Sequence, residues 1–125
     1  MEEIKSFEDL RCWQKGRELR NTIKDLIKTF PESEKYELVS QMRRASRSVT
    51  HNIAEGYGRF HFRENIQFCR FSRGSLYELL DQFIAAYDEN YISEEAFKNY
   101  RKQVMECLAI LNGYINYLKR SINND

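Results

Sequence analysis

Apolar residues recur at alternating steps of three and four along most of this chain. In residues 38–53 they fall at Leu38, Met42, Ala45, Val49 and Ile53. This period places the apolar side chains on one face of an α-helix, whereas a half-buried strand requires alternation at every second residue. Similar series occupy the segments 69–86 and 97–122. The sequence therefore predicts an all-α fold with no strands.

Helix-breaking residues divide the periodic stretches. Pro31 ends the first helix, because the residue before proline is disfavoured in the α conformation. Gly56 is predicted to end the second helix in the left-handed conformation, and Gly58 reinforces that turn. Ser93 begins the last helix as its N-cap. We predict a single domain, an antiparallel up-down-up-down four-helix bundle with left-handed packing, its helices lying at about residues 7–30, 33–55, 62–89 and 94–121.

Two details of the first helix carry further expectations. Ser6 is placed to cap it, with Asp9 at the position of a capping box. Gly16 lies on the Trp13 side of the helix, where glycine costs roughly 1 kcal/mol relative to alanine. We interpret Gly16 as space for the close approach of a neighbouring helix.

Charge is segregated although the whole chain carries only +1. Residues 40–75 hold seven cations against two acids, and residues 76–106 hold three cations against seven acids. All seven cations of the first segment are arginines, which form bidentate bonds to phosphate or carboxylate. With His51 and His61 they form the candidate binding set: Arg43, Arg44, Arg47, Arg59, Arg63, Arg70 and Arg73.

Two interpretations of these arginines remain open. In the first, Arg43, Arg47, Arg63 and Arg70 hold the phosphates of a nucleic acid, and nearby aromatic rings stack on exposed bases. The candidate rings are those of Tyr57, Phe60 and Phe62. In the second, the same arginines pair with carboxylates of the third and fourth helices or of a neighbouring subunit. The first interpretation predicts nucleic-acid binding that weakens steeply with salt.

Sequence signals for catalysis, metal binding or membrane insertion are weak. The cysteines, Cys12, Cys69 and Cys107, are odd in number and widely spaced, which argues against a disulfide framework and against a CxxC metal site. Neither histidine belongs to a metal-ligand motif. No apolar run approaches the roughly 20 residues of a membrane span. We expect a cytoplasmic, non-enzymatic protein with no catalytic residue, metal site or cofactor.

The third and fourth helices each carry a second apolar stripe. On the fourth helix it is formed by Tyr100, Cys107, Ile110, Tyr114 and Tyr117. A bundle helix needs one stripe for its own core, so the excess suggests contact with further copies of the chain. The alternative is that these tyrosines shield the edges of the bundle.

The segment that holds most of the arginines also carries a family resemblance. The stretch 41–59 reads QMRRASRSVTHNIAEGYGR, and it resembles the signature of proteins encoded in intervening sequences of 23S ribosomal RNA genes, also called S23-type ribosomal proteins. The chain also resembles this family, in the same order along the sequence, at three other stretches: FEDLRCW, FPESEKYEL and GSLYELLDQFIAAY. The family includes the accessory variability determinant of diversity-generating retroelements.

The resemblance implies a four-helix bundle that assembles into a ring-like pentamer. For the retroelement member it also implies a basic surface that binds nucleic acid and a reverse transcriptase, although that member is strongly basic and this chain is nearly neutral. Three residues match polar positions of the family pattern: Asn52, Glu55 and Ser75. They form either a shared site or a hydrogen-bonded structural cluster, and we favour the structural interpretation.

These observations lead to two hypotheses from different classes. The first is a non-enzymatic oligomeric adaptor that binds RNA, or a protein that handles RNA such as a reverse transcriptase, through its arginine surface. The alternative is a scaffold for protein–protein interaction without nucleic-acid binding, in which basic and acidic faces meet.

Overall fold

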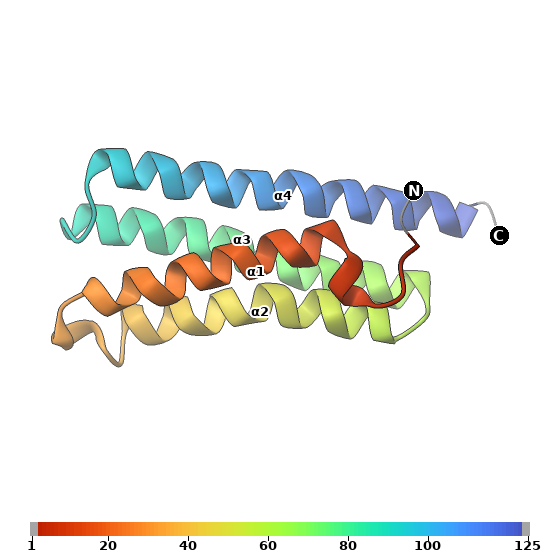
Figure 1. Cartoon of the computed structure of the whole chain (residues 1–125), viewed down its shortest axis with the longest axis horizontal. Helices are drawn as coiled ribbons and strands as arrows, with labels where there is room; N and C mark the ends of the chain where they lie inside the picture. The colour runs from red at the N-terminus through yellow and green to blue at the C-terminus, as the bar shows by residue number, and fades with distance from the viewer. Residues whose placement is uncertain (1–2, 124–125) are drawn as a thin grey trace.

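A computed structural model describes residues 3–123 of the chain. Four α-helices run antiparallel, and each packs against its two neighbours around the bundle (Figure 1). The described residues contain no strand, so the predicted all-α four-helix bundle is confirmed. The helices are α1 (Arg11–Leu26), α2 (Leu38–Gly58), α3 (Phe62–Asp88) and α4 (Glu94–Asn123).

Short 3-10 helices replace parts of the expected first and second helices. They are η1 (Phe7–Asp9), η2 (Ile27–Thr29) and η3 (Glu32–Glu34). The capping box at Ser6 is present, but it caps η1, and α1 begins only at Arg11. The backbone N–H of Glu8 donates to Ser6 Oγ at 3.1 Å, and the N–H of Ser6 donates to Asp9 Oδ2 at 3.2 Å.

The expected end of the second helix is wrong. The helix α2 continues through Gly56 to Gly58, and no described glycine has a positive φ. The left-handed residue of this turn is instead Phe60, with φ 58°. Gly56 is buried against α3, where a Cβ would lie 2.9 Å from Phe68 Cβ. Its small size therefore serves the close packing of two helices and not a turn.

One apolar core runs along the bundle, and the predicted stripes form it. Met42, Ala45, Val49 and Ile53 of α2 are all at most 1% exposed. Phe83 of α3 is fully buried and stacks on Tyr100 of α4, with ring centroids 4.9 Å apart. The apolar stripe of each helix is buried in this core. Charged side chains of the same helices therefore lie outside the core, along the borders between neighbouring helices.

The expectation for Gly16 is confirmed by the packing of α1 on α2. A Cβ at Gly16 would lie 3.1 Å from methyl carbons of both Val49 and Thr50. Close approach at this point sets α1 and α2 side by side, and it fixes which of their polar residues face one another.

Candidate nucleic-acid interface

The helix α2 presents two arginines along its border with α1. Arg43 and Arg47 each follow a core residue, Met42 and Ser46 respectively, by one position. Because residues four apart lie on the same helix face, the two guanidinium groups stand one turn from each other. Both are exposed.

The helix α1 contributes two more cations to the same border. Arg20 and Lys24 are also four apart, and with Arg43 and Arg47 they line one hollow of about 140 Å³. Its remaining lining residues are Asn21, Ile23, Ile27 and Ser46, so no carboxylate is among those described. Arg20 Nη1 donates to Thr50 Oγ1 at 2.9 Å, which holds its side chain against α2. We call this hollow, with its four cations, the α1–α2 basic groove.

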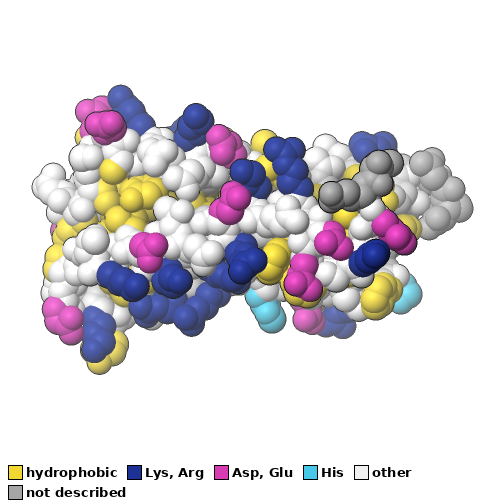
Figure 2. Space-filling view, in the orientation of Figure 1, with side chains coloured by type: hydrophobic (Ala, Val, Ile, Leu, Met, Phe, Trp, Pro, Cys, Tyr) yellow, Lys and Arg dark blue, Asp and Glu magenta, His cyan; other side chains and the backbone are white. Residues whose placement is uncertain are grey.

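The surface around this groove is visibly basic. Figure 2 shows lysine and arginine side chains gathered in a row along the left half of the lower edge of the molecule, over α1 and α2. None of the four groove cations takes part in an ion pair within the part of the chain that the structure describes. The groove therefore has positive charge available for an external anion.

A second basic groove lies at the junction of α3 and α4. Arg63, Arg70 and Lys119 line a hollow of about 340 Å³ together with Ile66, Ile122 and Asn123. Since α1 neighbours α2, and α3 neighbours α4, around the four-sided bundle, this α3–α4 basic groove lies across the molecule from the first.

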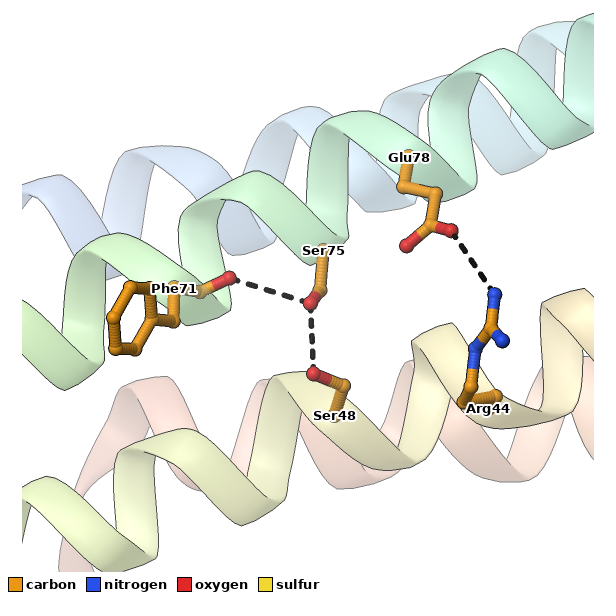
Figure 3. Close-up of polar contacts among 5 residues, drawn as sticks. All are labelled: Arg44, Ser48, Phe71, Ser75 and Glu78. Atoms are coloured by element: carbon orange, nitrogen blue, oxygen red, sulfur yellow. Dashed lines mark hydrogen bonds and ion pairs between the residues drawn. The ribbon is translucent and has the colours of Figure 1, made fainter.

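The other three predicted arginines are engaged within the chain. Arg44 Nη2 lies 3.7 Å from Glu78 Oε1 of α3 (Figure 3). Arg59 Nη2 lies 2.9 Å from Glu55 Oε1, and its guanidinium stacks over the Phe68 ring at 5.1 Å. Arg73 Nη1 donates to Asn112 Oδ1 at 3.0 Å. The seven arginines therefore divide between two grooves and a set of internal contacts, and they do not form a single surface.

Sequence reasoning did not include Arg20, Lys24 or Lys119. They lie outside the arginine-rich segment 40–75, and only the packing of the helices brings them beside it. The available signal was the spacing of Arg20 and Lys24, four apart beside the core residues Leu19 and Ile23.

Two of the three polar family positions share a hydrogen-bonded cluster between α2 and α3. Ser48 Oγ and Ser75 Oγ lie 2.8 Å apart, and Ser75 Oγ donates to the backbone oxygen of Phe71 at 3.3 Å (Figure 3). Asn52 Nδ2 donates to Ser48 Oγ at 3.0 Å and to the Ser48 backbone oxygen at 2.9 Å. Glu55 lies apart from this cluster and pairs with Arg59.

Replacing Asn52 by alanine tests the structural interpretation of this cluster. We expect Asn52→Ala to lower the free energy of unfolding by about 1 kcal/mol, because the lost hydrogen bonds outweigh the better helix propensity of alanine. RNA binding should stay unchanged. Asn116, exposed on α4, provides the control, since Asn116→Ala should be neutral or slightly stabilising. Weaker binding with unchanged thermal melting would assign Asn52 to a binding site instead.

The cysteines and histidines do not form an evident reactive site. Burial raises the pKa of Cys12 and of Cys69 to about 12, and that of Cys107 to about 11. All three thiols are therefore protonated at neutral pH, a state unsuited to nucleophilic attack. His51 and His61 are exposed, and no metal-binding cluster of three or more acidic, histidine or cysteine residues occurs within residues 3–123. No described helix is both long and apolar enough to cross a membrane.

Comparison with known proteins agrees with this architecture. A crystal structure of a protein of unknown function from the S23 ribosomal protein family of Bacteroides thetaiotaomicron is similar, with a TM-score of 0.77 and 19% identity. The similarity covers 84% of this chain and 95% of that one. No curated protein matches the chain. The sequence profile of the 23S rRNA-intervening sequence proteins matches residues 8–113, and the chain therefore belongs to that family.

Proposed function

We propose that this protein is a non-enzymatic, oligomeric adaptor that binds RNA, and that the α1–α2 basic groove holds the RNA backbone. The observation that carries the proposal is the convergence of Arg20, Lys24, Arg43 and Arg47 on one hollow without a lining carboxylate. Arginine is suited to this task because its planar guanidinium binds phosphate oxygens in pairs.

The near-neutral net charge supports a local contact over general attraction to polyanions. With +1 overall, the long-range field of the molecule is weak, so binding depends on the two grooves where positive charge is concentrated. Each phosphate neutralised there releases counterions, which makes affinity sensitive to salt. The Arg44–Glu78 ion pair lies outside both grooves, and we interpret it as a structural contact between α2 and α3.

The second apolar stripe expected on α4 lies mostly inside the bundle, since Cys107 is 5% exposed and Tyr100 stacks on Phe83. Other exposed apolar side chains on α3 and α4 support self-association. Tyr77 is 53% exposed, Ile84 41% and Met105 38%. Surfaces of this kind are commonly buried between subunits. We propose that identical copies bury this face, with five subunits as the family resemblance implies, and that the assembly acts in the cytoplasm. A reverse transcriptase or another RNA-handling protein is a candidate further partner.

Size-exclusion chromatography with light scattering tests both parts of the proposal. The purified protein is run at low salt with and without a labelled mixed pool of RNA. The proposal predicts a pentamer that co-elutes with RNA. A monomer at micromolar concentration would overturn the oligomeric part. An oligomer that ignores RNA would overturn the RNA part, and the arginines would then serve the scaffold alternative by pairing with acidic protein surfaces.

A further inference from the structure

The turn between α2 and α3 holds an aromatic residue in a costly position. Phe60 has a φ of 58°, a conformation that normally favours glycine, and its side chain is 83% exposed. Its backbone N–H donates to the oxygen of Tyr57 at 3.3 Å, a bond that any residue there would form. The ring lies 6.1 Å from the Tyr57 ring, centroid to centroid. Contacts within the chain therefore give little reason for a large aromatic side chain at position 60.

Phe60 instead borders an aromatic pocket at this end of the bundle. The pocket has a volume of about 290 Å³ and is shaped by the α2–α3 turn, the last turns of α4 and the N-terminal segment. Tyr117 and Phe62, which are 54% and 38% exposed, also line it. The size is near the lower limit of about 300 Å³ for small-molecule sites, which suits one flat ring system.

The same pocket contains polar groups that are fixed in place. Asn65 is 7% exposed, and its Nδ2 donates to Tyr114 Oη at 3.1 Å. Asn65 Oδ1 accepts a hydrogen bond from Cys69 Sγ at 3.5 Å. With His61 also in the lining, the pocket combines apolar ring faces with amide, phenol and imidazole groups. This combination matches a nucleobase, which has two apolar faces and a polar edge.

Positive charge lies directly beside this pocket. Phe62 and Asn65 of the pocket alternate along α3 with Arg63 and Ile66 of the α3–α4 basic groove. On α4, the pocket residues Tyr117 and Leu118 are followed by the groove residue Lys119. The groove and the pocket therefore share both helices, so one strand could place a phosphate in the groove and a base in the pocket. Aromatic stacking beside a basic track is the usual design for binding single strands.

We propose that the aromatic pocket receives an unpaired nucleobase, so that the RNA ligand is a single strand or a loop and not a continuous duplex. The inference rests on the proposed function, and it names the form of RNA that the protein selects. Bases inside an A-form helix are stacked on their neighbours and inaccessible to such a pocket. Duplex RNA would reach only the basic grooves.

The variant Phe60→Gly separates binding from folding at this position. Glycine removes the ring and also relieves the positive φ, so the free energy of unfolding should stay the same or rise. We expect its affinity for a labelled single-stranded oligonucleotide to fall about tenfold, the loss typical of one stacked base. Affinity for the matching duplex should not change. The control is Tyr36→Ala, an equally exposed aromatic at 84%, for which no loss is expected.

Two results would overturn the inference while leaving RNA binding intact. One is single-strand affinity in Phe60→Gly equal to that of the unchanged protein, and the other is equal loss for single strand and duplex. If the unchanged protein binds neither RNA, the proposed function fails. A titration with adenosine monophosphate, followed by NMR of the tyrosine rings, then decides the pocket by itself. Saturable shifts that vanish in Phe60→Gly support a base-binding pocket, and their absence rejects it.

Discussion

Changing Arg43 and Arg47 together to glutamate is expected to weaken RNA binding by about a hundredfold, since each lost charge-assisted contact costs about 1.5 kcal/mol or more. Both side chains are exposed and line the α1–α2 basic groove. The variant leaves Arg20 and Lys24 opposite two new carboxylates, so the groove loses its net positive charge. Fluorescence anisotropy of a labelled single strand at low salt measures the change, and thermal melting should remain that of the unchanged protein.

Another charge reversal of equal size gives the control for net charge. Arg101 and Lys102 are exposed on α4 and line neither basic groove. Changing both to glutamate alters the total charge by the same amount, and we expect a much smaller loss of affinity. Equal losses in the two double variants would show that RNA responds to overall charge and would contradict a defined groove.

The substitution Gly56→Ala is expected to lower the free energy of unfolding by about 1–3 kcal/mol, as overpacking in a tight core does. A Cβ at this position would lie 2.8 Å from Asn65 Oδ1, 2.9 Å from Phe68 Cβ and 3.1 Å from the Asn65 backbone oxygen. Two of these atoms are fixed to the backbone of α3, so the helices must separate to admit the methyl group. This cost outweighs the gain of about 1 kcal/mol that alanine brings to a helix interior.

Gly113 supplies the matched comparison, because it is exposed on α4 and a Cβ there would meet no atom within 4 Å. Gly113→Ala should therefore raise the free energy of unfolding by up to about 1 kcal/mol. Urea denaturation followed by circular dichroism measures both variants. If Gly56→Ala proved as stable as Gly113→Ala, the close contact of α2 with α3 at Gly56 would be incorrect.

The helical periodicity was sufficient to predict the architecture, because each bundle helix must bury one apolar stripe. Glycine was harder to interpret. Gly16 and Gly56 both allow close helix packing, whereas Gly56 looks in sequence like the end of a helix. The actual left-handed residue, Phe60, could not be predicted, since a phenylalanine in that conformation is contrary to its local preference.

The binding surface was predictable only in part. The sequence indicated Arg43 and Arg47 as neighbours on one helix face, since spacing within a helix determines this. Their pairing with Arg20 and Lys24 depends on the register between α1 and α2, which the close contact at Gly16 helps to fix. The hydrogen bond from Arg73 to Asn112 depends in the same way on the register between α3 and α4, so the sequence could not predict it.

The salt dependence of RNA binding tests the central claim most directly. If the four cations of the α1–α2 basic groove each neutralise a phosphate, they contribute about −3 to the slope of the logarithm of the binding constant against the logarithm of salt concentration for single-stranded RNA. Phosphates held in the α3–α4 basic groove make the total slope steeper. The slope should become markedly shallower when Arg43 and Arg47 are both changed to glutamate. An affinity that does not respond to salt, or no complex even at low salt, would contradict the assignment of this groove to RNA phosphates.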